Sequence, residues 1–402
     1  MIGWGAAALL GGASLAAWRH WPEQGLWNPC LAPLPRRLAT HELVHSAWRG
    51  IDAARVWDAH AHLAGTGDSD SGILVNPAMH SLASPGQYAR RAFFLNAGCA
   101  HDAPGSVDRA YVERLRNLLD GMPLTKLMLF AFDRTHDERG EPDPEHTAFY
   151  VPDAYARDTA RAHPQYFEWV ASIHPYARDA VERLQRAKRE GARAVKWLPA
   201  AMGIDPASSR IQKYYEAMKT LDLPLISHAG EERAVLGRDA HDFGNPLRLR
   251  RALEAGVRVV VAHCASMGSD RDLDRGANGP YVDSFSLFIR IFEKYEKHAY
   301  GDISAMTQIN RAGPALKRVI EDEGWHPRLL NGSDYPLPGV MPLFSVQHLV
   351  SIGLLSGSFS EVLTEIRRHN PLLFDFVLKR ALRSSGKALP ARVFETRAFF
   401  MR

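Results

Sequence analysis

From residue 51 onward, the sequence alternates between short apolar runs and helix-like segments. The apolar runs number eight and are residues 56–62, 126–133, 168–174, 192–198, 223–228, 258–263, 300–305 and 328–334. Strands that alternate with helices predict right-handed βαβ units and a parallel sheet. Eight such units predict an α/β fold of the (β/α)8 barrel type. A doubly wound open sheet is the alternative, but no glycine-rich phosphate loop follows any of these runs.

Three of the intervening segments repeat apolar side chains at helical spacing. They are residues 178–190, 209–221 and 281–297, where apolar positions recur every three or four residues. This period predicts amphipathic helices that bury one face against the sheet. The candidate N-caps are Asp153, Ser208 and Ser209.

The connections between predicted elements differ in length according to direction. Those from a helix to the next strand are short, whereas three from a strand to the next helix are long, namely residues 63–107, 135–152 and 264–280. A barrel carries its active site at the face where its strands end, and long loops in compact domains usually carry function. We expect residues 63–107 to form a lid or a pocket wall at that face.

Polar side chains stand at or near the ends of five of the predicted strands. In a strand, side chains two positions apart project to the same side, so His60 and His62 face the same way. Each residue taken singly has a plain structural explanation, but together they bring imidazoles and a carboxylate to one rim. Such a set suits Zn²⁺, and less selectively Mn²⁺ or Fe²⁺. The six residues are His60, His62, Lys196, His228, His263 and Asp334.

In order and spacing, these motifs resemble the amidohydrolase superfamily. The match is best to its amidohydrolase-2 branch, which includes decarboxylases and lactone hydrolases, and it runs from about residue 56 to 374. It rests on short sequences at residues 58–62 (DAHAH), 196–199 (KWLP), 227–231 (SHAGE), 262–264 (AHC) and 332–336 (GSDYP).

The resemblance implies a role for each of the rim residues. His60, His62, His228 and Asp334 would bind a divalent metal, and Asp334 would also take a proton from the attacking water. His263 would be catalytic in an enzyme with one ion, or a ligand where there are two. Lys196 would be a ligand only if CO₂ had converted it to a carbamate. One zinc ion is favoured over two.

The chemistry expected of such a centre is hydrolysis. Water on a divalent ion is acidic near neutral pH, and it would attack an amide, lactone or ester carbonyl of a small organic molecule. A non-oxidative decarboxylase of a small carboxylic acid is the first alternative, and a catalytically silent metal-binding protein is the remote one. The residues expected to contact substrate are His174, Trp197, Glu231 and Arg311.

Charge and cysteine content exclude some other classes. The net charge is +4, and residues 379–402 contribute seven basic residues and one acid, so the rest of the chain carries about −2. Nothing here suggests nucleic-acid binding. The three cysteines, Cys30, Cys99 and Cys264, are odd in number and scattered, so we expect neither a disulfide framework nor a cysteine metal site.

The two ends of the chain are expected to lie outside the barrel. Residues 1–18 contain no charged side chain and fit a signal anchor, a cleaved signal peptide or a soluble extension. An inner-membrane anchor or a cytoplasmic location follows from these alternatives, and a homodimer is left open. The expected division is an apolar segment (1–20), a linker (21–50), the barrel (51–378) and a basic, helical tail (379–402) that docks on the barrel.

Overall fold

Eight parallel strands form the centre of the molecule, one in each of the predicted runs. The structure is a computed structural model that describes residues 23–100, 105–123, 125–137, 139–235 and 240–401. The strands Phe167–Val170 and Ala299–Asp302 each begin one residue before the predicted range, and the other six fall within theirs. The strands are β1 (Trp57–His62), β3 (Lys126–Phe130), β5 (Phe167–Val170), β6 (Val195–Trp197), β7 (Leu225–His228), β8 (Val259–Ala262), β11 (Ala299–Asp302) and β12 (Leu329–Leu330).

The strands close into a barrel. They form two parallel ladders, β1-β3-β5 and β6-β7-β8-β11-β12. A parallel bridge between Ala171 and Val195 joins β5 to β6, and another between Ala61 and Tyr335 joins the end of the last strand to β1. The N–H of His62 also donates to the carbonyl of Tyr335 at 2.8 Å. The predicted barrel is therefore confirmed, and the open-sheet alternative is excluded.

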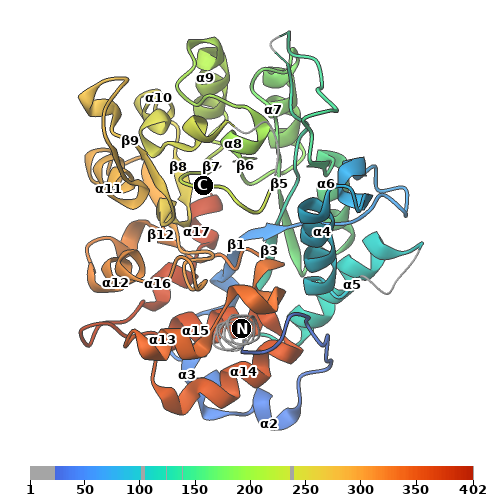
Figure 1. Cartoon of the computed structure of the whole chain (residues 1–402), viewed down its shortest axis with the longest axis vertical. Coiled ribbons are helices and arrows are strands. Elements are labelled where there is room, and N and C mark those ends of the chain that lie inside the picture. Colours follow the sequence, from blue (N-terminus) through green and yellow to red (C-terminus); the bar gives the residue numbers. More distant parts are fainter. Residues whose placement is uncertain (1–22, 101–104, 124, 138, 236–239, 402) are drawn as a thin grey trace, which may run out of the picture.

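Helices surround these strands, with α9 to α12 on one side and α4 to α6 on the other (Figure 1). Most of them follow a strand and cover the outside of the barrel, as expected for βαβ units. The helices are α2 (Arg36–Ala39), α3 (Glu42–Trp48), α4 (Pro85–Ala97), α5 (Val107–Asp120), α6 (Asp153–Ala162), α7 (Ala180–Arg189), α8 (Pro199–Met202), α9 (Gln212–Thr220), α10 (Arg250–Glu254), α11 (Ser284–Lys294), α12 (Pro314–Glu321), α13 (Val346–Ser351), α14 (Ser360–His369), α15 (Pro371–Ala381), α16 (Ala391–Phe394) and α17 (Arg397–Phe400).

The three predicted helices are present as α7, α9 and α11, and two predicted helix starts are corrected. Helix α11 begins at Ser284, because residues 281–283 form strand β10 (Tyr281–Asp283), which pairs antiparallel with β9 (Ser269–Arg271). Asp153 is not an N-cap: it is the first residue of α6, and its carboxylate accepts a hydrogen bond from the N–H of Ser172 at 2.8 Å. Ser208 caps the short 3-10 turn Ser209–Ile211 that leads into α9.

The C-terminal tail docks on the barrel, as predicted, and supplies part of its interior. Phe399 and Phe400 are buried in one cluster with inward-facing strand residues such as Trp57 and Phe130. A guanidinium N–H of Arg258 donates to the carbonyl of Phe399 at 2.8 Å. The aromatic end of the tail therefore completes the hydrophobic core inside the barrel.

A disulfide between Cys30 and Cys99 joins the N-terminal arm to the segment just after helix α4, although no disulfide framework was expected from the sequence. The two Cα atoms lie 5.7 Å apart although 69 positions separate them, so sequence spacing gives no sign of the pairing. The Trp27 ring stacks on Phe93 of α4 at a centroid distance of 4.9 Å.

Among the described residues, no helix has the length and apolarity to cross a membrane. Residues 1–18 lie outside the described part.

The two long loops nearest the N-terminus meet beside the rim. Residues 63–107 contain β2 (Leu74–Val75), a 3-10 turn (Pro77–His80) and α4. Strand β2 pairs antiparallel with β4 (Phe149–Tyr150), which belongs to the loop after β3. Asp108, fully buried at the start of α5, accepts hydrogen bonds from the N–H groups of Thr66 and Gly67. This segment is therefore an ordered wall beside the strand ends.

Candidate metal centre and active site

Strand β1 brings two histidines to the rim. Its register against β3 shifts between Asp58 and Ala61, which marks a bulge around His60, and bulges near active sites re-aim side chains. The ring centroids of His60 and His62 lie 5.2 Å apart. The His60 side chain is buried, whereas that of His62 is 23% exposed. The two imidazoles therefore border the same space at different depths.

Asp334 lies in a turn held tightly against β1. Its N–H donates to the carbonyl of His60 at 2.7 Å, and the N–H of Ser333 donates to Asp58 Oδ1 at 2.8 Å. Asp334 has a φ of 60°, a left-handed conformation that is uncommon for residues with a Cβ atom. Gly332 permits the close approach, because a Cβ atom there would lie 2.5 Å from the Cβ of His60. These constraints fix the Asp334 carboxylate beside the two histidines.

Three potential ligand atoms meet at this point. Asp334 Oδ1 lies 3.4 Å from His60 Nε2 and 3.2 Å from His62 Nε2. Ligand atoms on a tetrahedral ion with bonds of about 2.0–2.1 Å are roughly 3.3 Å apart. The spacing of the three atoms therefore fits one divalent ion, and all three lie within 4.8 Å of one another.

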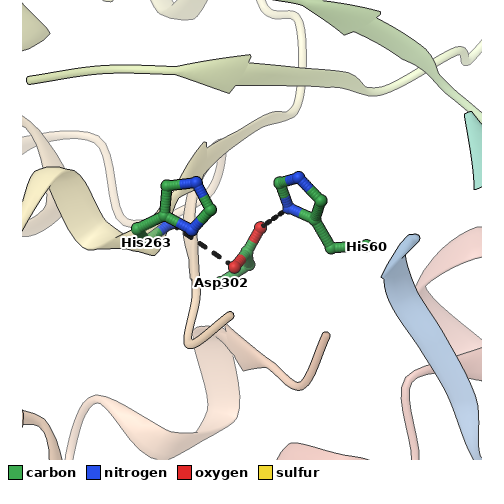
Figure 2. Close-up of side chains that lie close together, drawn as sticks. All are labelled: His60, His263 and Asp302. Atoms are coloured by element: carbon green, nitrogen blue, oxygen red, sulfur yellow. Dashed lines mark hydrogen bonds and ion pairs between the residues drawn. The ribbon is translucent and has the colours of Figure 1, made fainter. Parts of the chain in front are cut away.

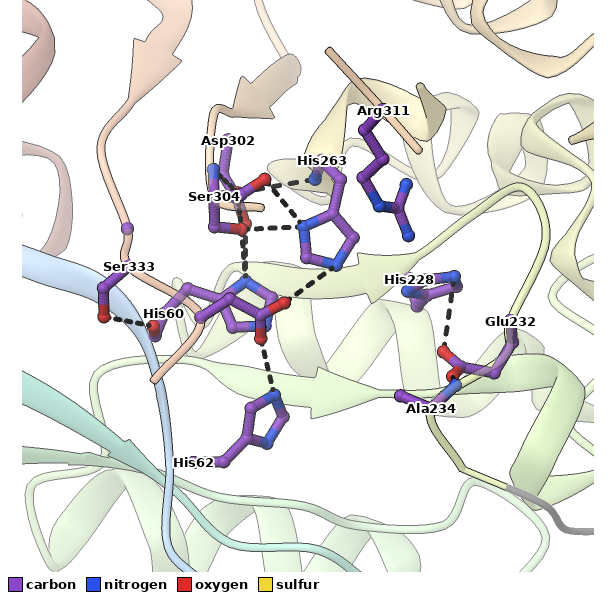
Figure 3. Close-up of polar contacts among 12 residues, drawn as sticks. His60, His62, His228, Glu232, Ala234, His263, Asp302, Ser304, Arg311 and Ser333 are labelled. Carbon is purple, nitrogen blue, oxygen red and sulfur yellow. Dashed lines mark hydrogen bonds and ion pairs between the residues drawn. The ribbon is translucent and has the colours of Figure 1, made fainter. Parts of the chain in front are cut away.

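His263, at the end of β8, contacts the same carboxylate. It has a φ of 55°, and the next two residues also have left-handed backbone. Its Nδ1 lies 3.0 Å from the carbonyl oxygen of Ser304, which can only accept, so Nδ1 carries the proton. Its Nε2 lies 3.7 Å from Asp334 Oδ2. Figure 3 shows His263 turned toward the centre of the site. Its free nitrogen therefore faces the space where the ion would bind.

Burial keeps these imidazoles in the form that binds metals. It lowers the pKa of His60 and His263, and it lowers the pKa of His228 to about 4. Burial alone would raise the pKa of Asp334, but its interactions with His60 and His263 bring that pKa below its ordinary value. At neutral pH the cluster thus offers neutral imidazoles and an ionised carboxylate, which are the protonation states that metal binding requires.

A cavity of about 380 Å³ opens over these residues. We call its polar end the floor; its residues are His60, His62, Lys196, His228, His263, Arg311 and Asp334. Most of the remaining lining is apolar and comes from residues 63–107, 149–151 and 337–343, which we call the wall. The lining is completed by Leu198, residues 232–235, Met267, Gln308, Asn310 and Pro336. The wall includes Ile73, Phe93, Phe94, Phe149, Val151 and Leu343. The prediction that residues 63–107 form a pocket wall is therefore confirmed.

Comparison with known protein families agrees with a barrel that carries potential metal ligands at its rim. A family model described as Amidohydrolase matches residues 57–348, which is most of the barrel. The chain belongs to the amidohydrolase family. This confirms the resemblance inferred from the motifs. No curated protein matches the chain in sequence.

Several solved structures resemble this amidohydrolase at low sequence identity. An uncharacterised TIM-barrel protein from Bordetella bronchiseptica is 17% identical, covering 77% of this chain and 98% of that one, with a TM-score of 0.46. A probable 2-pyrone-4,6-dicarboxylic acid hydrolase from Acinetobacter baumannii is 16% identical, covering 78% and 95%, with a TM-score of 0.42. A 5-carboxyvanillate decarboxylase from Sphingomonas paucimobilis is 13% identical, covering 80% and 97%, with a TM-score of 0.41.

Lys196 lies beside the metal ligands, as its place on the fourth predicted strand suggested. It is buried, and its Nζ lies 3.2 Å from His60 Nε2. Burial lowers the pKa of Lys196 to about 8, although the nearby carboxylates, chiefly Asp302, oppose the shift. A protonated amine cannot bind a cation, so Lys196 would be a metal ligand only as a carbamate. That modification stays a prediction.

His228 reaches the floor but belongs to neither of the two groups of potential ligands found among the described residues. Its Nε2 lies 3.4 Å from Glu232 Oε2, and Figure 3 shows the two side chains facing each other. Its ring centroid is 5.2 Å from that of His263. A metal-binding role for His228 would require Nε2 to exchange Glu232 for the ion, so this role also stays a prediction.

Asp302, at the end of β11, is a site residue that sequence reasoning missed. Its Oδ2 accepts a hydrogen bond from His60 Nδ1 at 2.7 Å (Figure 2). Its Oδ1 accepts a hydrogen bond from the N–H of Ser304 at 2.7 Å. Because His60 donates the hydrogen bond to Oδ2 through Nδ1, its Nε2 is unprotonated and has the lone pair that metal binding requires. Asp302, His60 and His263 also form the second group of close ligand atoms. The available signal was a lone acid inside the run at residues 300–305.

Two residues expected to contact substrate lie behind the barrel lining. In β6, side chains alternate, so Lys196 faces the site and Trp197 faces the helices. The Trp197 indole N–H donates to the carbonyl of Ile173 at 3.0 Å. His174 is fully buried, and its Nε2 bonds to the carbonyl of Met202 at 3.0 Å. Neither side chain lines the cavity, so both expectations are corrected to structural hydrogen bonds.

The acidic residue after His228 that lines the cavity is Glu232, whereas the sequence analysis named Glu231. The carboxylate of Glu231 pairs with Arg233 at 2.7 Å and does not line the cavity, whereas Glu232 does. Residue spacing cannot choose between adjacent residues in an irregular loop, because no repeating geometry relates them. Arg311 does line the cavity, as expected for a residue that contacts substrate.

Proposed function

We propose that this amidohydrolase is a metal-dependent hydrolase that cleaves an amide, lactone or other ester bond of a small organic molecule. The observation that carries the proposal is the meeting of His60 Nε2, His62 Nε2 and Asp334 Oδ1 at the floor of an apolar cavity. Those residues would hold one divalent ion, and zinc suits a set of imidazole and carboxylate ligands.

When bound, a divalent cation supplies Lewis acidity, which polarises a carbonyl oxygen and makes water acidic near neutral pH. The protein's own groups then move the proton. Asp334 is ionised and His263 Nε2 is unprotonated, and the two lie 3.7 Å apart, so either can accept a proton from water. The same pair can return that proton to the leaving group. The Ser304 carbonyl keeps His263 in the tautomer that this transfer needs.

The wall contributes by excluding bulk water from the reacting groups. Asp334, His60 and His263 are each at most 4% exposed, although the Asp334 carboxylate is ionised. Electrostatic interactions among groups shielded in this way are stronger than in water. The wall thus allows a few side chains to stabilise the charge that develops on a carbonyl oxygen.

A non-oxidative decarboxylase is the competing proposal. It is favoured by the cationic groups at the floor, Lys196 and Arg311, because a carboxylic acid substrate would require such partners. In that reaction a protonated His263 would deliver a proton to the carbon that loses CO₂. The two reactions use the same ligands and differ in the bond that breaks.

The test is to purify the protein, measure its metal content, and assay it before and after chelation. A panel of lactones, esters, amides and aromatic carboxylic acids would be assayed together with a direct measurement of CO₂. Metal-dependent hydrolysis without CO₂ would support the proposal, and CO₂ release would support the decarboxylase. Stoichiometric metal without turnover on any class would favour a catalytically silent metal-binding protein and overturn both.

A further inference from the structure

Lys379 and Asp375 form an ion pair that is buried behind the floor of the cavity. Both residues lie on helix α15, one helical turn apart, and each is 1% exposed. Lys379 Nζ lies 2.7 Å from Asp375 Oδ2, and the other carboxylate oxygen has no hydrogen bond within the described residues. A buried ion pair adds little to stability compared with apolar side chains of similar size, because both charges lose their hydration. Stability alone therefore does not account for this pair.

The second partner of Lys379 is the backbone just after the last strand. Its Nζ donates to the carbonyl of Gly332 at 2.6 Å, and among the described residues it is the only donor to that oxygen. Residues 331–334 follow β12 and belong to no strand, so strand pairing does not satisfy this carbonyl. Lys379 therefore supplies a hydrogen bond that the barrel itself does not provide.

The same peptide unit is bonded at its other end as well. The N–H of Ser333 belongs to the peptide unit that carries the Gly332 carbonyl, and it donates to Asp58 Oδ1 at 2.8 Å. Asp58 lies on β1 and Lys379 on α15, so a strand and a helix hold opposite ends of one planar group. This unit cannot rotate without breaking a hydrogen bond. The direction in which the chain enters Asp334 is thereby fixed.

Asp334 needs this support, because its own backbone conformation is unfavourable. Its φ of 60° lies in the left-handed region, which residues with a Cβ atom adopt where surrounding contacts impose it. Its Oδ1 lies 3.4 Å from His60 Nε2 and 3.2 Å from His62 Nε2. Rotation of the preceding peptide unit would move this oxygen relative to both imidazoles. The bond from Lys379 thus bears on the position of a proposed metal ligand.

We propose that Lys379 is a positioning residue: through the Gly332 carbonyl, it holds the turn in which Asp334 presents its carboxylate to a divalent ion. This inference rests on the proposed function, because it takes Asp334 as a ligand of that ion. Lys379 does not line the cavity, so its effect passes through the backbone. Helix α15 lies beyond residues 57–348, which the family model matches, so a segment outside that match becomes part of the site.

Two variants isolate the bond to Gly332. Asp375→Asn breaks the ion pair but keeps Lys379 and its hydrogen bond to the carbonyl. A double variant, with Asp375→Asn and Lys379→Met, removes that bond too. Lys379→Met alone is avoided, because it would leave the Asp375 carboxylate buried without a partner. Comparison of the double variant with Asp375→Asn therefore cancels the loss of the ion pair.

The control is Lys126→Met, at the opposite end of the barrel. Lys126 is the first residue of β3, and its Nζ donates to Glu168 at 2.7 Å. Glu168 also accepts a hydrogen bond from Arg193 at 2.8 Å, so it keeps a partner in this variant. The control loses a lysine–carboxylate bond of the same length without touching the rim, so both readouts below should stay at the wild-type level.

Hydrogen–deuterium exchange of the metal-free proteins measures the turn directly. Peptides that cover residues 331–336 should exchange roughly tenfold faster in the double variant than in Asp375→Asn, because one buried hydrogen bond is lost. Peptides that cover residues 225–228 of β7 should exchange equally in both. Zinc affinity, measured by competition with a chelator, should fall roughly tenfold to a hundredfold between the same two variants. The double variant should melt no lower than Asp375→Asn.

Equal exchange at residues 331–336 in the two variants would overturn the inference, as would faster exchange there with an unchanged zinc affinity. Faster exchange at residues 225–228 together with a lower melting temperature would also overturn it, because Lys379 would then support the whole barrel. If the wild type binds no zinc but exchange of the turn still depends on Lys379, the proposed function fails and the support of the turn stands.

Discussion

The floor and the wall of the cavity differ in how their side chains are fixed. On the floor, His60 and Asp334 are held by strand pairing, a buried carboxylate and the absence of a side chain at Gly332. The wall instead consists of short elements between long loops, tied down by Asp108 and by a disulfide from the N-terminal arm. For the proposed hydrolase, we therefore expect the floor to determine which reaction is catalysed and residues 63–107 to determine which ligand binds. Changes on the floor should therefore abolish turnover, and changes in the wall should alter affinity.

The largest expected effect comes from the floor. Asp334→Asn should lower kcat/KM by roughly 10²–10⁴-fold, because a proton acceptor and a negatively charged ligand are lost together. His60→Ala should remove the bound metal. Kinetics and metal analysis would measure both, and circular dichroism should show an intact barrel. A fully active variant at either position would place the reaction elsewhere.

Removing support behind the floor should have a smaller effect. Asp302→Asn leaves His60 in place but weakens the hydrogen bond that fixes its tautomer, so metal affinity should fall roughly tenfold to a hundredfold. Competition with a fluorescent chelator measures this directly. Asp322→Asn is a suitable control, since Asp322 pairs with Arg318 away from the site. Unchanged metal affinity in Asp302→Asn would make Asp302 a purely structural residue.

Loosening the wall should separate affinity from turnover. A protein with both Cys30→Ser and Cys99→Ser loses a cross-link over 69 positions, which chain-entropy arguments value at about 4 kcal/mol. We expect a lower unfolding temperature and a KM raised several-fold, with kcat nearly constant because no floor residue moves. Calorimetry and steady-state kinetics give the two readouts. A large fall in kcat with an unchanged KM would contradict the division between wall and floor.

The smallest effect concerns a buried pair behind the floor. Lys379 Nζ donates to the carbonyl of Gly332 at 2.6 Å and to Asp375 Oδ2 at 2.7 Å. Burial raises the pKa of Asp375 to about 7, with Asp58 and Asp334 acting in the same direction and Lys379 opposing them. A raised pKa means that the folded state favours the protonated acid. The contribution of Asp375 to stability is therefore complete below about pH 4 and is lost as the pH rises through about 7.

Denaturation curves of the wild type and Asp375→Asn between pH 4 and pH 8 test this sign. The stability of the wild type relative to the variant should decline over that interval, with a slope of at most about 1.4 kcal/mol per pH unit for one proton. A difference that is flat or rises with pH would show that Asp375 stays ionised in the folded state.

The sequence predicts the floor better than the wall for a physical reason. Strand geometry repeats every two residues, so the spacing of His60 and His62 places both at one rim before any contact is known. The same alternation, applied to β6, would have turned Trp197 away from the site once Lys196 was assigned to it. The direction of the Trp197 side chain therefore follows from that of Lys196 by strand alternation alone.

Beyond the strands, no comparable rule is available. Irregular segments follow no repeating geometry, so their side chains are placed only by the way the segments cross in the folded protein. This applies to the choice between Glu231 and Glu232 and to the pairing of Cys30 with Cys99. Asp302 lies on a predicted strand, but its hydrogen bond with His60 spans 242 positions. Such contacts need the closed barrel before they can be identified.

The seating of the tail inside the barrel bears on how the protein is made. The hydroxyl of Thr396 donates to the carbonyl of Trp57 across 339 positions, and Phe399 and Phe400 share a core with the first strand. During synthesis, the first strand emerges long before these aromatic residues, so a nascent chain holds a barrel whose interior is still incomplete. Contacts of such long range slow folding. Phe399 and Phe400 therefore complete the interior of the barrel only after the strands around them have been synthesised.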